Sequence, residues 1–253
     1  MCNRPQKLFV VSDLHGHFTP LQEALEQAGF DPRHPDHLFI HCGDLFDRGR
    51  ENRRVYEFVG GLERKILIRG NHDERLADVL AETYIDEHDL YNGMQTTLHE
   101  FFGEGCVNAS GEITFGDRLK TACDLRRLVA GMSDYFETDH YVFVHGWLPL
   151  DLLCDPPALA EDWRQGGDMA WHRARWTKWL DVFRNPAAFP EKTVICGHRP
   201  TRLAATVDPA RAPDDSSVYQ SPGMIAIDAG TIRSGRVNLL VLEDTISERT
   251  TDA

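Results

Sequence analysis

The sequence lacks the patterns of a secreted or membrane-bound protein. Its six cysteines include no C-x-x-C pair. In a chain of this length they indicate reduced thiols rather than a disulfide framework. No apolar run reaches the length of a membrane span, and the first residues hold too few apolar side chains for a signal peptide. These absences predict a cytoplasmic protein that has no membrane partner.

Positive charge is also scarce. Lys and Arg number 27 against 40 Asp and Glu, which leaves a formal charge of −13. Because affinity for long nucleic acids comes mostly from neutralising phosphates, we expect no such partner. A group of arginines or metal ions can still attract a small phosphorylated substrate, since the field inside a cleft need not follow the net charge. The sequence does not indicate the oligomeric state.

Short apolar runs bounded by turn residues predict the β-strands. Their continuous apolar character is typical of strands that are buried on both faces. Segments with helical spacing separate the first three runs, and this alternation indicates an α/β protein. The runs lie at residues 7–12, 37–42, 65–69, 140–145, 192–196, 224–228 and 237–243.

The segments between these runs predict helices and one long excursion. Thr19 is the predicted N-cap of a first helix, which Gly29 can end. Residues 74–139 are predicted to be mostly helical. Residues 149–190 are rich in Pro and Trp and are predicted to form an excursion over the sheet edge that carries a short helix. Because no repeat or linker is evident, we expect residues 1–253 to form a single domain.

Polar motifs follow six of the predicted strands, in the order SDLHGH, GDLFDRG, RGNHD, HGW, GHRP and DAG. Because loops at the carboxyl ends of strands converge on one edge of an α/β sheet, the motifs predict a shared site. Its candidate ligands carry oxygen or imidazole donors and no thiolate, which suits divalent manganese, iron or zinc. Two ions that share a carboxylate fit the number of ligands better than one ion. The candidates are Asp13, His15, Asp44, Asn71, His145 and His198.

Taken together, the motifs resemble those of the calcineurin-like metallophosphoesterases, and within them the phosphoprotein phosphatase branch. The family pattern D-x-H, G-D-x-x-D-R-G, G-N-H-D/E, H-G and G-H is matched in order along most of the chain. The resemblance implies the family's α/β fold, in which two mixed β-sheets pack as a sandwich flanked by helices. The matching residues are 13–15, 43–49, 70–73, 145–146 and 197–198.

The resemblance also implies which residues hold two divalent metal ions, with manganese preferred and iron or zinc as alternatives. Asp13, His15 and Asp44 would hold the first ion. Asp44 would bridge to the second ion, whose other ligands would be Asn71, His145 and His198. A hydroxide that bridges the ions would attack the phosphorus atom.

The remaining motif residues acquire roles in catalysis by the same resemblance. His72 would be the general acid for the leaving group, and Asp47 would orient it. Arg48 and Arg69 would bind the phosphate oxygens. The family has a further phosphate-binding arginine between its two late histidines, and here the segment WHRARW offers two positions. Arg173 is preferred, with Arg175 as the alternative.

Three other positions carry expectations of their own. Trp147 stands where the family often has a small residue, and it is expected to narrow or wall the cleft. Asp228 is predicted to shape a strand-end turn rather than bind metal. His41, like the other histidines outside the motifs, is predicted to lie at the surface or to be hydrogen-bonded.

The resulting hypothesis is a phosphomonoesterase that acts on phosphoserine or phosphothreonine in proteins. The alternative is a symmetrical dinucleoside polyphosphate hydrolase, because diadenosine tetraphosphatases share the five motifs. The partner is therefore a phosphorylated protein or a small phosphorylated substrate. A non-catalytic binding module is disfavoured, because all of the expected ligands and the acid are present.

Overall fold

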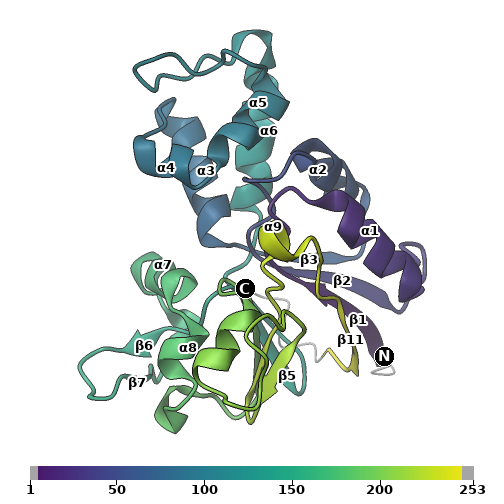
Figure 1. The fold of residues 1–253 in the computed structure, drawn as a ribbon, viewed down its shortest axis with the longest axis vertical. Helices are drawn as coiled ribbons and strands as arrows, with labels where there is room; N and C mark the ends of the chain where they lie inside the picture. Colours follow the sequence, from purple (N-terminus) through teal and green to yellow (C-terminus); the bar gives the residue numbers. More distant parts are fainter. Residues whose placement is uncertain (1–4, 247–253) are drawn as a thin grey trace.

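The structure is a computed structural model that describes residues 5–246, and two β-sheets lie at its centre (Figure 1). The first sheet has the strand order β11-β1-β2-β3. Its inner strands pair in parallel, whereas β11 lies antiparallel at the edge. The strands are β1 (Gln6–Val11), β2 (His37–Cys42), β3 (Lys65–Ile68) and β11 (Leu240–Asp244).

The second sheet has the order β4-β5-β8-β10-β9. Its three central strands are parallel, and an antiparallel strand closes each edge. The strands are β4 (Tyr135–Glu137), β5 (Tyr141–Val144), β8 (Thr193–Cys196), β9 (Tyr219–Ser221) and β10 (Met224–Ala226). A separate two-stranded hairpin pairs β6 (Leu150–Asp151) with β7 (Ala158–Leu159).

The two sheets share a buried apolar layer. Val10 and Ile40 of the first sheet belong to the same core cluster as Phe143 and Ile195 of the second. The predicted α/β fold, a sandwich of mixed sheets flanked by helices, is therefore confirmed. The prediction that the strands are buried on both faces is wrong for β11, because its first four residues alternate between partly buried and exposed. This edge strand keeps one face in contact with solvent. The shared layer supports our proposal of a single domain.

Helices cover the outer face of the first sheet and extend beyond it (Figure 1). The prediction that residues 74–139 are mostly helical is confirmed. The Thr19 cap is wrong, because the helix begins at Phe18 and the Thr19 backbone N–H and hydroxyl both donate to Glu51. The helices are α1 (Phe18–Gln27), α2 (Asn52–Gly61), α3 (Asn71–Glu82), α4 (Glu87–Tyr91), α5 (Met94–Phe102), η1 (Gly116–Arg118) and α6 (Leu119–Ala130).

The segment 149–190 packs on the outer face of the second sheet through buried tryptophans. It carries more structure than the single short helix that was predicted, because it also contains the β6–β7 hairpin. No helix within residues 5–246 has both the length and the apolar character needed to cross a bilayer. The remaining helices are η2 (Trp163–Gln165), α7 (Asp168–Trp176), α8 (Trp179–Val182), η3 (Pro186–Ala188), η4 (Thr201–Thr206) and α9 (Thr231–Ser234).

Candidate metal centre and active site

The motif loops follow the carboxyl ends of strands in both sheets, and they meet around a cavity of about 420 Å³. Its lining includes Asp13, His15, Asp44, Asn71 and His198, and also His72. His145 approaches the same group from behind, where its Nε2 lies 2.8 Å from Asn71 Oδ1. The structure therefore brings together all six candidate ligands, although they are distributed over 186 positions of the sequence, from 13 to 198.

The backbone of these loops is strained where it presents the side chains. Six of the seven non-glycine residues with positive φ in the described part of the chain belong to the motifs. Each such residue costs about 1–2 kcal/mol, and such residues cluster at functional sites. These residues lie two to six positions beyond the ends of β1, β2 and β8, in the loops that follow the strands. The six are Asp13, His15, Asp44, Asp47, Arg48 and His198.

Two glycines are required by the close approach of a ligand to the backbone. A Cβ atom on Gly70 would lie 2.1 Å from Asp44 Oδ1, and one on Gly197 would lie 2.2 Å from Asp13 Oδ2. Both glycines have ordinary φ values, so space rather than backbone conformation excludes larger residues. The G-N-H and G-H motifs thus place two carboxylates directly against neighbouring main chain.

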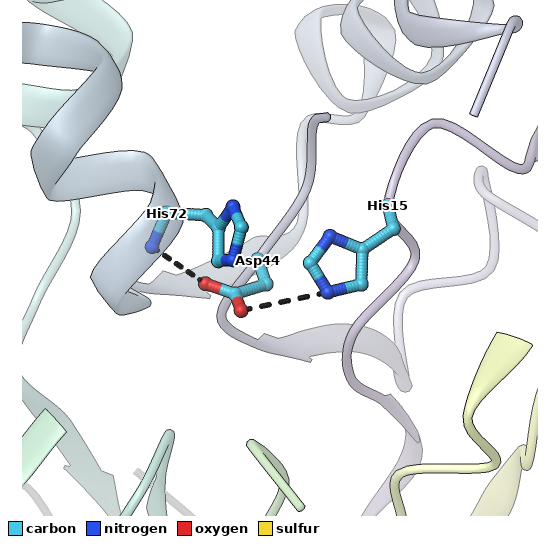
Figure 2. A group of neighbouring side chains, drawn as sticks. All are labelled: His15, Asp44 and His72. Atoms are coloured by element: carbon cyan, nitrogen blue, oxygen red, sulfur yellow. Dashed lines mark hydrogen bonds and ion pairs between the residues drawn. The ribbon is translucent and has the colours of Figure 1, made fainter. Parts of the chain in front are cut away.

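Asp44 lies at the centre of the site with its two oxygens directed to different neighbours (Figure 2). Oδ1 accepts a hydrogen bond from the backbone N–H of His72 at 2.9 Å. Oδ2 lies 3.7 Å from His15 Nε2 and 3.5 Å from His145 Nε2. Burial opposes ionisation of Asp44, but the adjacent histidines, His145 foremost, outweigh burial and hold its pKa well below the usual value. Asp44 is therefore an anion placed between imidazoles that come from both sheets.

Two of these imidazoles are oriented from behind by backbone carbonyls. His15 Nδ1 donates to Phe46 O at 3.0 Å, and His145 Nδ1 donates to Cys42 O at 2.9 Å. Burial lowers the pKa of both histidines, so that the rings are neutral near pH 7. A neutral ring that donates from Nδ1 carries its lone pair on Nε2, the nitrogen that faces the site. Both histidines are thus ready to bind a metal ion.

The candidate ligands of the second ion converge on the Asn71 side-chain oxygen. Asn71 Oδ1 lies 2.8 Å from His145 Nε2 and 3.0 Å from His198 Nδ1. Burial, followed by the neighbouring His145, lowers the pKa of His198 to about 3. Donor atoms of Asp44, His145 and His198 also lie within 4.8 Å of one another. Neutral imidazole and oxygen donors at this spacing fit a divalent cation.

The candidate ligands of the first ion include buried carboxylates that lie close to one another. Donor atoms of His15, Asp44 and His72 lie within 4.8 Å of one another. Asp13 is next to them and accepts hydrogen bonds from the Ser12 hydroxyl at 2.6 Å and the His198 backbone at 2.9 Å. Burial, then the charges of Asp228 and Asp44, raises the pKa of Asp13 well above its usual value. Buried like charges of this kind are stabilised when they coordinate metals.

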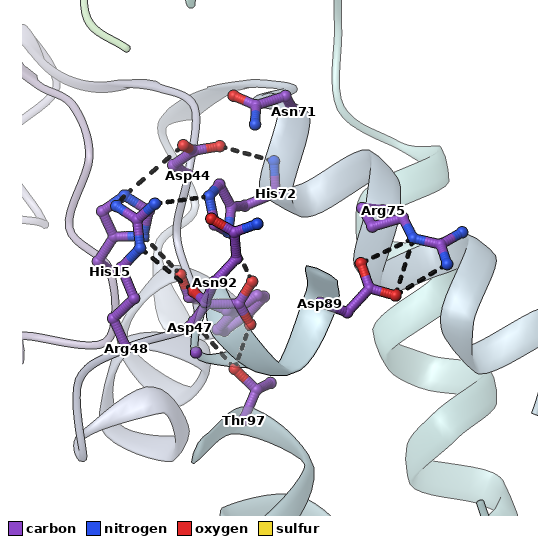
Figure 3. A network of polar contacts seen from close by, with 12 residues as sticks. His15, Asp44, Asp47, Arg48, Asn71, His72, Arg75, Asp89, Asn92 and Thr97 are labelled. Carbon is purple, nitrogen blue, oxygen red and sulfur yellow. Dashed lines mark hydrogen bonds and ion pairs between the residues drawn. The ribbon is translucent and has the colours of Figure 1, made fainter. Parts of the chain in front are cut away.

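His72 forms a buried pair with Asp47 beside the carboxylates (Figure 3). His72 Nδ1 lies 2.8 Å from Asp47 Oδ2, while Asp47 Oδ1 accepts from the Thr97 hydroxyl at 2.6 Å. Burial disfavours the charged ring, but Asp44 and Asp47 together outweigh burial and raise the pKa of His72. Thr97 was not found from the sequence, because it lies on α5, outside every motif.

Only one of the predicted phosphate-binding arginines lines the cavity. Arg48 Nη1 lies 2.9 Å from His15 Nε2, and its Nη2 lies 3.1 Å from His72 Nε2. The structure does not bring Arg69 to the site. Its guanidinium donates to Met132 O at 3.1 Å, and the residue lines a separate hollow beside α3 and α6. The reason is local, because the Arg69 backbone bonds to Ser133 and the side chain follows that side of the chain.

Neither arginine of the WHRARW segment reaches the cavity. Arg173 is exposed, whereas Arg175 is buried and bonds to Asp134 at 2.6 Å and to Glu74. Three other arginines line the cavity instead, and sequence reasoning missed them. They are Arg199, Arg202 and Arg233, two of which follow directly in GHRPTR. That adjacency was the available signal, but the family spacing directed attention to the residues before His198.

The exposure and hydrogen bonds of Trp147, Asp228 and His41 test the expectations for these three residues. Trp147 does not wall the cleft, because it is only 1% exposed and donates from its ring to Ala188 O at 3.0 Å. Asp228 shapes its turn as predicted by accepting from the Gly230 backbone at 2.6 Å, and it also lines the cavity. The prediction for His41 is wrong, because the ring is fully buried and neither nitrogen has a hydrogen-bond partner within the described residues.

Asp73 is a supporting residue that sequence reasoning left without a role. Its carboxylate accepts hydrogen bonds from the backbone N–H groups of Asp44 at 2.8 Å, Leu45 at 3.0 Å and Gly70 at 2.9 Å. Burial, then the charge of Asp44, raises the pKa of Asp73 to about 7. The residue therefore ties the loop after β2 to the loop after β3. Its place at the end of RGNHD was the signal.

We expect Asp73→Ala to lower the free energy of unfolding by about 2–4 kcal/mol, because three buried N–H groups lose their acceptor. Urea unfolding of the metal-free protein measures this change. Asp78→Ala, which removes an exposed carboxylate from the same helix, is the matched control and should change stability little. If the two variants are equally stable, Asp73 does not hold the loops together.

Comparison with known proteins places these features in a family. The family model described as calcineurin-like phosphoesterase matches residues 6–222. A symmetrical bis(5'-nucleosyl)-tetraphosphatase of Glaesserella parasuis is 42% identical over 73 residues, which are 28% of this chain and 26% of the relative. The chain thus matches about a quarter of that relative's length.

Two solved structures share the fold over most of their length. One is described as a putative diadenosine tetraphosphatase, with a TM-score of 0.54, 14% identity, and coverage of 96% of this chain and 95% of that chain. The other is a protein serine/threonine phosphatase from Saccharomyces cerevisiae, with a TM-score of 0.52, 14% identity, and coverage of 96% and 81%. At these identities the likeness concerns the fold.

Proposed function

Because the chain belongs to the calcineurin-like phosphoesterase family, we propose that it hydrolyses phosphate esters or anhydrides with two divalent ions, preferably manganese. Asp13, His15 and Asp44 would hold the first ion. Asp44, acting as the bridge, would hold the second ion together with Asn71, His145 and His198. Such a pair lowers the pKa of a water molecule, so that hydroxide is available near neutral pH.

The other residues of the site bind and protonate the substrate. His72 directs Nε2 toward the cavity, while Asp47 engages Nδ1 and fixes the orientation of the ring. His72 would therefore deliver a proton to the departing oxygen. Arg48 contacts that same ring nitrogen, so its guanidinium is within reach of a phosphate oxygen held in front of His72.

We propose a dinucleoside polyphosphate as the substrate, and the surplus of arginines in the cavity carries this proposal. A single phosphoryl group is already served by two metal ions and Arg48. Arg199, Arg202 and Arg233 also line the cavity, and within residues 5–246 none of their guanidinium groups forms an ion pair or a hydrogen bond. Unpaired guanidinium groups beside the metal site suit further phosphates. The name of the relative from Glaesserella parasuis agrees with this class.

Trp176 supports a nucleoside at the mouth of the cavity. It lines the cavity and is 44% exposed, with its ring centroid 6.1 Å from that of His198. The other tryptophans of the excursion, Trp163, Trp171 and Trp179, are at most 3% exposed. An exposed indole beside a phosphate site is a platform for a nucleobase.

We expect Trp176→Ala to raise the KM for diadenosine tetraphosphate by about 5- to 150-fold, since stacking is worth about 1–3 kcal/mol per base. Turnover of nitrophenyl phosphate, which has no base, should change little. Tyr84, also 44% exposed but outside the cavity lining, provides the control Tyr84→Ala. An unchanged KM for the dinucleotide would remove Trp176 from the binding site.

Phosphoserine and phosphothreonine in proteins are the second candidate, and the His72–Asp47 pair favours them. A serine alkoxide leaves poorly without a proton, whereas a nucleoside diphosphate is a much better leaving group. A positioned general acid is therefore more necessary for the phosphomonoester. The sequence alone favoured this substrate, but the unpaired arginines shift our preference to the polyphosphate.

The deciding experiment compares manganese-loaded protein on diadenosine tetraphosphate and on a phosphoserine peptide panel. We expect a higher kcat/KM for the dinucleotide, with ADP as the product, and no turnover of either after chelation. Preference for the peptides would establish the second candidate. We also propose a cytoplasmic location, in keeping with the absence of disulfides among the cysteines of residues 5–246.

A further inference from the structure

A second cavity of about 600 Å³ adjoins the first. The two cavities share Arg202, Gly230 and Arg233 in their walls, so one opens beside the other. The second cavity adds Arg236 and polar side chains, among them Ser217 and Asn238. Apart from Arg202, it contains no residue of the five motifs or of GHRPTR. Nothing in the family assignment gives it a role.

We propose that this second cavity is a binding site for the distal phosphates of a polyphosphate chain whose reacting phosphate lies at the metal centre. The inference rests on the proposed function, because it extends the same substrate away from the scissile bond. Arg233 lies in both walls and would contact the chain where it passes from one cavity to the other. Arg236 would contact the phosphates beyond that point.

The charges of the second cavity suit an anion of this kind. The side chains of Arg202, Arg233 and Arg236 form no ion pair within residues 5–246. Two carboxylates, Asp214 and Asp215, also line the cavity, so the arginines outnumber them by three to two. Asp215 is engaged locally, because it accepts from the Ser217 backbone at 2.9 Å and hydroxyl at 2.6 Å. It also lies 3.5 Å from Arg211. Arg202 is partly buried and Arg233 and Arg236 are exposed, so their guanidinium groups present positive charge on the cavity wall of a chain with a formal charge of −13, which suits an anionic ligand.

The walls of this cavity are tied to one another and to the metal loops. The Ser216 carbonyl accepts from Asn238 Nδ2 at 2.7 Å and from the Thr201 hydroxyl at 3.0 Å. Thr231, at the start of α9, donates its hydroxyl to Asp13 O at 3.1 Å. The segment that carries Arg233 is thus fixed directly to a predicted metal-ligand loop. Such linkage fixes the backbone that carries Arg233 relative to the proposed metal site.

Calorimetric titration with tripolyphosphate and with orthophosphate tests this proposal, because orthophosphate fits the metal centre alone. The manganese-loaded protein should bind tripolyphosphate more tightly than orthophosphate. The double variant Arg233→Ala/Arg236→Ala should weaken tripolyphosphate binding by about 10- to 100-fold, the range expected for charge-assisted hydrogen bonds, and orthophosphate binding by less than about two-fold. Arg33→Ala/Arg126→Ala removes the same charge from exposed positions outside both linings and should alter neither affinity.

Three results would overturn the assignment. They are equal weakening of both anions by Arg233→Ala/Arg236→Ala, weakening no greater than in the control variant, and tripolyphosphate that binds no more tightly than orthophosphate. The titration is independent of turnover. If the protein hydrolyses only phosphopeptides but binds tripolyphosphate through Arg233 and Arg236, the dinucleotide proposal fails and the second cavity stands.

Discussion

Asp44→Asn should lose metal binding and turnover together. Asp44 Oδ2 lies 3.7 Å from His15 Nε2 and 3.5 Å from His145 Nε2. The carboxylate therefore faces candidate ligands of both ions. A neutral amide cannot bridge two cations as a carboxylate does. We expect activity on nitrophenyl phosphate to fall by at least about 10³-fold, since the ions supply several kcal/mol of transition-state stabilisation. Elemental analysis of the variant should show less than two equivalents of manganese.

The fold should survive this substitution, because the amide oxygen of asparagine can still accept from the His72 backbone as Asp44 Oδ1 does at 2.9 Å. Asp78→Asn, at an exposed carboxylate outside the cavity lining, is the matched control and should retain both manganese and turnover. Two full equivalents of metal with undiminished turnover in Asp44→Asn would exclude the bridging role.

His72→Asn should retain metal but lose activity according to the leaving group. On a phosphoserine peptide the expected loss is about 10²- to 10⁴-fold, the usual contribution of a general acid. On nitrophenyl phosphate the loss should be much smaller, because nitrophenolate departs without a proton. Asp47→Asn should follow the same pattern more mildly, since it weakens the 2.8 Å contact that orients the ring.

The ratio of the two losses is the informative quantity, because it is insensitive to the amount of folded protein. His34→Asn removes an exposed histidine at the opposite ends of the strands and serves as the control. Equal losses on both substrates, with metal retained, would mean that His72 positions the phosphate or the nucleophile and that another group is the acid.

Much of the fold could be predicted because strand signals are local. Every apolar run that predicted a strand overlaps one, and the polar motifs follow β1, β2, β3, β5, β8 and β10 as expected. The pairing of the sheets came from the resemblance rather than from the runs. The β6–β7 hairpin was missed, because its strands are two residues long and leave no periodic pattern.

The supporting residues of the site were harder to predict. Thr97 and Asp73 act through hydrogen bonds to groups that are 50 and 28 to 29 residues away along the chain. No local pattern marks the Thr97 contact, because any threonine on a helix has an ordinary role of its own. The RGNHD motif marks Asp73, but it does not indicate which backbone groups the carboxylate holds. The carbonyls of Phe46 and Cys42, which orient His15 and His145, leave no mark in the sequence at all.

The sequence by itself determined which donor atoms can form the site and in what order they follow the strands. Residue type decides ligand chemistry, and a strand end decides which edge of the sheet a motif occupies. Only the tertiary structure decided which arginines line the cavity of the candidate metal site. Arg69 belongs to a motif, and Arg173 and Arg175 lie between two motifs, but none of the three lines the cavity, whereas Arg233 reaches it from the C-terminal part of the chain. A long side chain takes its direction from the helices and loops that pack around it, so only the packed fold specifies its target.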